Sequence, residues 1–463
     1  MIEGLQVNHL TLRKRDGAVS KVESRRHDGA QRPVIAGQRA VYRHCDEGSN
    51  PVKERPVDCF VPRNEGVESA NDESGLLRQP RFIPCGKKSM QLFMNRKLIH
   101  ITFFAVMLSL FVCCNKNKDS YYFNGNIRYI DNSSKTVKNV TSKSIRLDGV
   151  QSGMIAVYDS LLICWHPDFS NHFFYISNLD SGNEIGFFCE KGQGPKEATS
   201  VNCISQMFRK EDDICTFLWA YNESQLFLWN ISQSVEQRMT VYDTIVSYDK
   251  NRYFFLFYQP EDILFVNRPS DMLNSEEATT PFYEKRSIYT KEVIRDYPVY
   301  KKKSVKSRDA SMLEPFFYTW DVIKPDGTKI AQAMRSLPQI NMLDIHTGEV
   351  IGFRMQKGSD FSLLESYTDI KSKHIYYNCV QADDHFIYAT YWGKEQWVDR
   401  IGVEMPLLNT IHVFDWNGKL LYELITDRPF FRSIWLDQIR NRLYTIDVNT
   451  DEVYYLDLDE LNL

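Results

Sequence analysis

Three observations predict that most of this 463-residue chain folds as an all-β domain built from repeated antiparallel units. Paired aromatic residues recur in short alternating stretches such as 173–175, 253–255 and 454–455, and such residues favour strands. Turn signals separate these stretches. No amphipathic helix of globular length is visible. Four-stranded units repeated around a ring make a β-propeller, and the sequence predicts this fold.

The clearest unit lies at the end of the chain. Residues 411–415 and 420–424 alternate in polarity around Asn417-Gly418, and Asn-Gly is the strongest short-range hairpin signal. A second hairpin is predicted within 442–457. Four short antiparallel strands in about forty-five residues make one propeller blade.

The same order of strand, Asp, turn Gly and strand occurs upstream, at 174–185 and 341–351. Blades of about fifty-five residues divide the chain after residue 114 into about six, and seven shorter blades are the alternative. The charged segment 274–308 is expected to be a long loop. Such rings usually close by pairing an amino-terminal strand with the last blade, and residues 144–147 are the candidate strand.

A short export signal precedes the propeller. Residues 98–112 are mostly apolar, follow a basic stretch and end at Cys113-Cys114. A helix of this length spans about 23 Å, which is short of the roughly 30 Å hydrocarbon core of a bilayer. We therefore expect residues 94–114 to be a cleaved signal peptide, with an uncleaved signal anchor as the alternative.

Residues 1–93 contain none of the eight tryptophans, and charged residues interrupt every apolar stretch. Such a segment cannot bury enough apolar surface to offset its chain entropy, so we expect it to be disordered. The simplest account is a start codon assigned too far upstream, with Met94 the true start. A cytosolic basic arm ahead of a signal anchor is the alternative.

The end of the signal resembles that of a bacterial lipoprotein, in which a Cys becomes the lipidated first residue of the mature chain. A small residue usually precedes that Cys. Val112 before Cys113 is bulky, whereas Cys113 before Cys114 is small, so Cys114 is the expected lipidation site and Cys113 the alternative. Two or more acyl chains would hold the protein firmly on a membrane. Residues 115–140 are then expected to be a solvated tether, and 141–463 the propeller.

The chain resembles the TolB-like six-bladed β-propeller lipoproteins of Bacteroides-type bacteria. The resemblance rests on the end of the signal, on the blade pattern and on a turn motif of that family, Gly-x-Gly-Pro-x-Glu. The matching residues are Gly192, Gly194, Pro195 and Glu197. The resemblance covers roughly residues 120–463 and implies the fold. It implies almost nothing about activity.

The best candidate for a ligand or partner surface is an aromatic stretch next to an expected insertion at 392–406. Its residues are Tyr391, Trp392, Gln396 and Trp397. Aromatic faces at a propeller rim suit stacking on sugar rings or contact with a partner protein. Ordinary packing within the blade is the alternative.

Other chemistry-bearing patterns have simpler explanations. Residues 192–197 lack the Lys-Ser/Thr and the helix that a phosphate loop needs. Residues 447–451 begin like a calcium loop, but Glu452 and Leu458 stand where Gly and Glu belong. The triplet 383–385, Asp-Asp-His, has no partner at metal-ligand spacing. We therefore predict turns or loops at all three, with no catalytic residue, metal or cofactor.

Five cysteines follow the signal at irregular spacing, which matches neither a disulfide framework nor a zinc site. They are Cys164, Cys189, Cys203, Cys215 and Cys379. We expect several of them to be small buried hydrophobes, and Cys203 and Cys215 could meet across a hairpin. The basic run 301–308 is expected to be a solvated loop, with a weak contact to anionic lipid as the alternative.

These patterns predict an exported, lipid-anchored propeller that acts as a binding or scaffold protein of the bacterial envelope. Its expected partners are the membrane, through the lipid, and an envelope protein or glycan. The net charge of −4 gives no reason to expect nucleic acid. One acid, Asp119, follows Cys114 closely, which favours a periplasm-facing outer-membrane lipoprotein over a surface-exposed one. The alternative is a metal-dependent enzyme of the lactonase or lyase type, which needs several inward ligands.

Overall fold

A computed structural model describes most of the chain that follows the signal. The described residues are 119–149, 153–166, 169–247, 253–259, 262–267, 282–301, 313–367, 372–397 and 408–461. The predictions for residues 1–93, for the signal 94–114 and for Cys113 and Cys114 lie outside this part. Within it, no helix is long and apolar enough to cross a membrane.

Three four-stranded antiparallel sheets follow one another along the chain. The first contains β4 (Met154–Tyr158), β5 (Leu161–Trp165), β6 (His172–Asn178) and β7 (Glu184–Glu190). The second contains β8 (Phe208–Lys210), β9 (Asp213–Ala220), β10 (Gln225–Asn230) and β11 (Tyr242–Ser247), with α3 (Ile231–Gln237) between the last two. The third contains β12 (Tyr253–Gln259), β13 (Asp262–Asn267), β14 (Tyr283–Ser287) and β15 (Val293–Tyr297). Because β14 and β15 lie within 274–308, the expectation of one long loop there was wrong.

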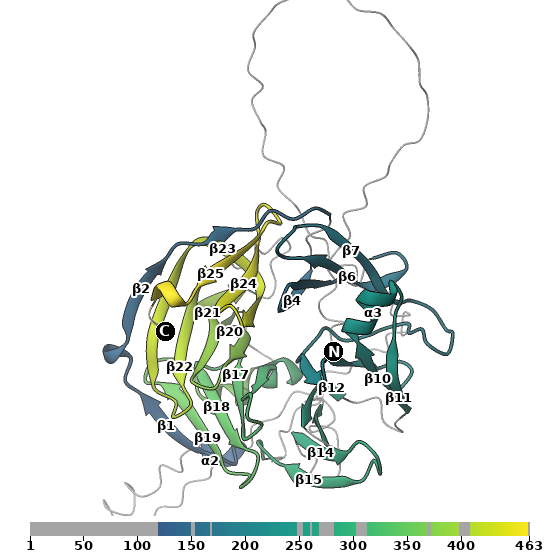
Figure 1. Cartoon of the computed structure of the whole chain (residues 1–463). Helices are drawn as coiled ribbons and strands as arrows, with labels where there is room; N and C mark the ends of the chain where they lie inside the picture. Colours follow the sequence, from purple (N-terminus) through teal and green to yellow (C-terminus); the bar gives the residue numbers. More distant parts are fainter. Residues whose placement is uncertain are drawn as a thin grey trace, which may run out of the picture. The chain divides into compact units, whose positions relative to one another are not determined.

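The remaining strands form three more blades in two sheets. The fourth blade contains β16 (Thr319–Ile323), β17 (Lys329–Met334), β18 (Gln339–Asp344) and β19 (Val350–Met355). The next sheet contains β20 (Ser372–Ala382), β21 (Phe386–Trp397), β22 (Leu408–Asp415), β23 (Leu420–Asp437), β24 (Arg442–Asp447) and β25 (Val453–Asp457). It spans two blades because β23 pairs with β22 in its first part and with β24 in its second. The described strands thus form an all-β propeller of six blades, which confirms the predicted fold (Figure 1).

The amino-terminal segment wraps around the outside of the last three blades. After the short α2 (Asp119–Tyr122), β1 (Asn126–Ile130) pairs in parallel with β19, and β2 (Thr136–Val140) pairs in parallel with β23. Figure 1 shows β1 and β2 at the outer edge of the ring. The third strand, β3 (Lys143–Ser144), pairs with β25 and completes the last blade. The chain therefore closes the ring with an amino-terminal strand, but this strand is Lys143–Ser144 and not the predicted 144–147. We call residues 119–144 the belt.

The belt corrects the prediction of a tether at 115–140. Residues from Asp119 onward belong to the propeller, because they contribute two strands to the outer edge and bury Tyr122 and Phe123 in its core. Only residues 115–118 separate Cys114 from the folded chain. These strands could not be recognised from the sequence because seven of their ten side chains are polar or solvent-exposed and no apolar alternation persists.

Charged side chains fix the belt to each of the three blades. At the fourth blade, Arg354 Nη1 donates to both carboxylate oxygens of Asp119 at 2.8 Å, and both residues are buried. At the fifth blade, Lys135 forms an ion pair with Glu423. The neighbouring His412 and Lys135 lower the pKa of Glu423 to about 2.

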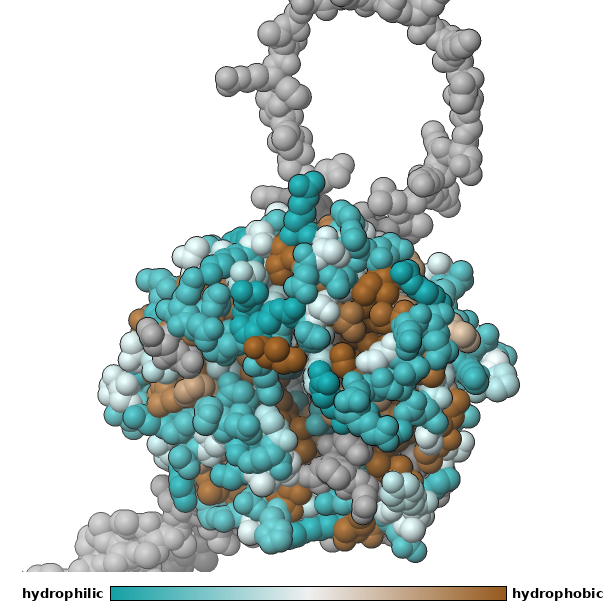
Figure 2. Space-filling view, viewed as in Figure 1, coloured by the Kyte–Doolittle hydropathy of each residue, from teal (hydrophilic) through white to brown (hydrophobic). Residues whose placement is uncertain are grey.

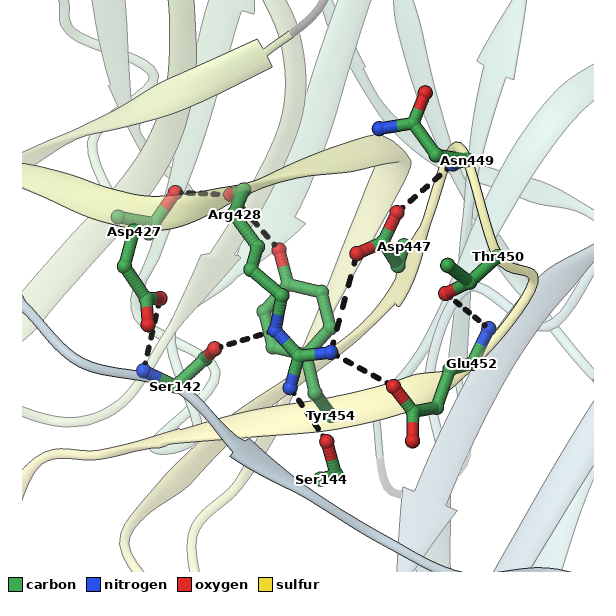
Figure 3. A network of polar contacts seen from close by, with 10 residues as sticks. Ser142, Ser144, Asp427, Arg428, Asp447, Asn449, Thr450, Glu452 and Tyr454 are labelled. Carbon is green, nitrogen blue, oxygen red and sulfur yellow. Dashed lines mark hydrogen bonds and ion pairs between the residues drawn. The ribbon is translucent and has the colours of Figure 1, made fainter. Parts of the chain in front are cut away.

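Arg428 holds the belt at the last blade (Figure 3). Its guanidinium donates to the hydroxyl oxygens of Ser142 at 2.8 Å and of Ser144 at 2.6 Å. The same group donates to a Glu452 carboxylate oxygen at 2.8 Å, and the Ser142 amide donates to Asp427 at 2.9 Å. A single arginine therefore connects Ser142 and Ser144 of the belt to Glu452, the residue just before β25.

Candidate functional site

The innermost parts of the blades enclose a small cavity. Among the described residues, its lining comes from β4, β5, β16, β20, β23 and the segment 203–205 before β8, so five of the six blades contribute. This position is the central channel of the propeller, and Figure 2 shows the face of the ring hollowed near its centre. The cavity volume is about 50 Å³. At about 10–15 Å³ for each water, this is room for about three to five water molecules.

The lining of the cavity is mostly apolar and carries one kind of charge. Three tryptophans take part, Trp165, Trp320 and Trp435. Asp321 is the one charged residue among the described lining residues, which include no Lys, Arg or His. Phosphate and carboxylate ligands would therefore meet no compensating charge, whereas neutral and cationic groups are compatible with this lining.

Four lining residues carry buried polar atoms that have no hydrogen-bond partner among the described residues. These atoms are Trp165 Nε1, Ser205 Oγ, Ser433 Oγ and both carboxylate oxygens of Asp321. A buried polar group without a partner costs about 1–3 kcal/mol, so such groups are few in folded proteins. Their meeting around one cavity indicates that water or a ligand supplies the missing partners there.

Asp321 lies in β16, in a strand whose sequence is otherwise mostly apolar. Burial raises the pKa of Asp321 to about 7, although the Thr319 and Tyr283 hydroxyl groups lie close enough to oppose part of this shift. Burial raises the pKa of Tyr283 and of Tyr300 well above the usual value, and the negative charge of Asp321 adds to this shift. Asp321 therefore changes its charge near neutral pH.

The raised pKa predicts how Asp321 affects stability. Because the carboxyl group binds its proton more tightly in the folded chain, its favourable contribution is complete below pH 3.8 and is lost as pH rises through about 7. Asp321→Asn is therefore expected to be more stable than wild type at about pH 8, by up to about 4 kcal/mol, with much of this advantage absent at about pH 4. Urea unfolding at the two pH values measures the difference. A difference that does not change with pH would contradict the prediction.

A row of buried polar side chains starts beside Asp321 and crosses the fourth blade. Asp321 lies opposite Gln332 on β17, and Gln332 lies opposite Asn341 on β18. Gln332 Nε2 donates to the Tyr283 hydroxyl oxygen at 3.0 Å, and Asn341 Nδ2 donates to Gln332 Oε1 at 2.6 Å. The Tyr300 hydroxyl also donates to Gln332 Oε1, at 2.7 Å.

The row continues to the outer edge of the blade and reaches the belt. Gln339 Nε2 donates to Asn341 Oδ1, and Arg354 Nε donates to Gln339 Oε1 at 2.7 Å. Gly352 leaves the space for this crossing, because a Cβ there would lie 2.6 Å from Gln339 Nε2. Arg354 then binds Asp119, so hydrogen bonds and an ion pair connect the blade interior to the first described residue.

The residues that the sequence analysis favoured for binding lie in a strand. β21 runs to Trp397 and pairs with β20 as far as Ser372, so Tyr391 to Trp397 do not form a loop. The Tyr391 ring stacks on the buried imidazole of His412, with centroids 4.0 Å apart, and Trp392 packs against the core of the fifth and sixth blades. Gln396 is half-buried, and the side chain of Trp397 lies outside the described residues. Packing in the blade thus accounts for Tyr391 and Trp392, and a binding role for this stretch stays a prediction.

The other patterns singled out from the sequence are turns. A Glu197 carboxylate oxygen accepts the Gly194 amide at 2.9 Å. Asp447 accepts the Asn449 amide at 2.8 Å, and Asp383 accepts the His385 amide at 2.7 Å. Among the described residues, no three His, Cys, Asp or Glu side chains gather in a way that could hold a metal ion.

The five described cysteines are buried, and no disulfide joins Cys203 to Cys215. Burial raises the pKa of both of these thiols to about 12, so they have little thiolate character. Cys203 and Cys379 contribute to the lining of the cavity as small apolar side chains.

The cavity residues could not be identified from the sequence because they do not belong to a common motif. Trp165, Ser205, Asp321 and Ser433 come from four different blades and are far apart in the sequence. An acidic residue inside the strand Thr-Trp-Asp-Val-Ile was the one signal, since carboxylates are seldom placed in buried strands.

Comparisons with known proteins place the chain among propellers. The model of a family described as TolB-like 6-blade propeller-like matches residues 131–430. The chain is similar to the structure of a DUF4221 family member from Bacteroides vulgatus, with 10% identity and a TM-score of 0.48, over 68% of this chain and 95% of that one. It is also similar to a candidate exported protein from Bacteroides fragilis, with 12% identity and a TM-score of 0.43, over 69% of this chain and 99% of that one. The comparison with curated proteins found no match.

Proposed function

Because this chain belongs to the TolB-like 6-blade propeller family, we propose that it is a lipid-anchored binding protein of the bacterial envelope whose central cavity is its ligand site. The convergence of four residues with unpartnered buried polar atoms on that cavity carries the proposal. A ring that needed its channel only for packing would be more stable with apolar side chains at these positions.

The membrane part of the proposal rests on the sequence before the belt. The signal at 94–114 supports export, and Cys114 supports lipidation at the start of the mature chain. Asp119 is buried in the propeller. Only four residues separate it from Cys114, so the chain between these two residues spans at most about 18 Å in any conformation. A lipidated Cys114 would therefore hold the fourth blade close to the bilayer, and we favour the periplasmic side.

The ligand-binding part is tested with the full-length protein and a small-molecule extract of its native host. The protein is incubated with the extract, washed and denatured, and released compounds are identified by mass spectrometry. Wild type is expected to release one compound in stoichiometric amount. Ser433→Val, which replaces a lining hydroxyl by a methyl group and adds a second methyl group, is expected to release much less at a melting temperature no lower than that of wild type. Equal release from both proteins, or none from wild type, would contradict the proposal.

A further inference from the structure

We propose that the central cavity binds a primary ammonium group that carries a neighbouring hydroxyl, as in a small amino alcohol. The inference rests on the proposed function, since it names the chemical class of ligand for the same cavity. Charge, hydrogen-bonding capacity and size each select this class.

The charge of the lining selects a cation. Asp321 is a buried carboxylate that only hydroxyl groups face, and no cationic residue is among the described lining residues. An ammonium group gives the carboxylate a counter-charge and hydrogen bonds together, which is the arrangement that makes a buried charge tolerable. The indole rings of Trp165, Trp320 and Trp435 surround the same space, and an indole is the best aromatic partner for a cation.

The unpartnered hydrogen-bonding groups select the rest of the ligand. A primary ammonium has three N–H donors, and Asp321, Ser205 and Ser433 provide three acceptors in the lining. The indole N–H of Trp165 is a donor only, so an ammonium group cannot satisfy it. A hydroxyl oxygen beside the ammonium supplies the acceptor that this N–H lacks.

The size of the cavity limits the ligand to a few atoms. Its volume of about 50 Å³ corresponds to about three to five waters, and ethanolamine has four heavy atoms. A metal ion would find one carboxylate, because no cluster of three His, Cys, Asp or Glu occurs among the described residues. Divalent cations in proteins usually have more anionic or carbonyl ligands than this.

Binding of an ammonium group requires the ionised form of Asp321. The titratable groups that face this carboxyl group are the hydroxyls of Tyr283 on β14 and of Tyr300 after β15, and both stay neutral in the physiological range. Affinity is therefore expected to rise with pH as Asp321 loses its proton, and to level off when ionisation is complete.

The experiment is calorimetric titration of the full-length protein with ethanolamine, with tryptophan fluorescence as a second readout. One saturable site is expected, at least tenfold tighter for ethanolamine than for ethylene glycol, which lacks the ammonium, and for phosphoethanolamine, which adds an anion. Asp321→Asn is expected to lower the affinity at least tenfold, and Asp384→Asn, at an exposed loop carboxylate, to leave it unchanged. Should Asp321→Asn fail to fold, Ser205→Ala and Ser433→Ala are each expected to weaken binding several-fold.

Three results would overturn the inference. The first is the absence of saturable binding, which would mean that water alone fills the cavity. The second is equal affinity for ethanolamine and ethylene glycol, and the third is tighter binding of calcium or potassium than of ethanolamine. A protein that still takes up a compound from the host extract, and loses it in Ser433→Val, would keep the proposed function and reject only the ammonium class.

Discussion

Asp119→Ala is expected to lower the free energy of unfolding by about 3–5 kcal/mol, because it leaves the buried guanidinium of Arg354 without a counter-charge. Arg354 is 2% exposed, and its Nη1 meets both carboxylate oxygens of Asp119. Its Nε is engaged with Gln339, so the guanidinium cannot turn toward solvent without breaking the polar row. Urea unfolding of the full-length protein measures the loss.

Two controls separate this effect from loss of packing. The double variant Asp119→Leu with Arg354→Met replaces the pair by apolar side chains and is expected to recover much of the stability, because no uncompensated charge remains. Lys210→Met removes one partner of the exposed ion pair between Lys210 and Asp243 and is expected to cost about 1 kcal/mol or less. A cost for Asp119→Ala as small as that for Lys210→Met would contradict the role assigned to this pair.

Deletion of residues 119–140 is expected to prevent folding of the propeller. The deletion removes Asp119 and two strands of the belt, and it also removes the buried side chains of Phe123, Ile130 and Val140. Each fully buried apolar side chain contributes about 1.5–3 kcal/mol. Together with the lost ion pair, this approaches the 5–15 kcal/mol that stabilises a typical domain.

Replacement of residues 115–118 by a Gly-Ser sequence of the same length is the matched control. These four residues precede the belt, and their replacement is expected to leave folding unchanged. Circular dichroism and size-exclusion chromatography report the outcome. A deletion variant that melts cooperatively at the wild-type temperature would show that residues 119–140 are the tether that their sequence suggests.

Local pairing explains which parts of the fold could be predicted from the sequence. The Asn417-Gly418 turn joins neighbouring strands, and Gly418 has the positive φ of 83° that such a turn requires. Four-stranded blades repeat this local signal, so the propeller could be recognised without any long-range information. The turn at Gly194 and Glu197 was predictable for the same reason, since its hydrogen bond spans three residues.

The belt and the cavity depend on contacts that the local sequence does not record. β2 pairs with β23, whose residues lie 286 positions further along the chain, and three of its five side chains face solvent. Nothing in the local sequence marks Gln332 and Asn341 as buried. The register of β17 and β18 places them side by side in the interior. Residues 392–397, the start of the expected insertion at 392–406, belong to β21, because the β20–β21 hairpin is longer than the others and length alone does not distinguish a long hairpin from a loop. Residues 398–406 lie outside the described part.

The position of the belt changes what lipidation would do. A flexible tether of 26 residues would let the propeller move freely above a membrane, whereas the four residues between Cys114 and Asp119 would hold one blade next to it. The membrane anchor and the ion pair of Asp119 with Arg354 would then share one short segment. Lipidation at Cys114 is therefore central to this account of the protein.

Metabolic labelling with a fatty-acid analogue in the native host tests that claim most directly. Wild type is compared with Cys114→Ala and Cys113→Ala, and the size of the labelled product is measured. Label is expected on a product that starts near Cys114, lost in Cys114→Ala and kept in Cys113→Ala. An unlabelled product that retains residues 94–114 would contradict it and would indicate an uncleaved signal anchor instead.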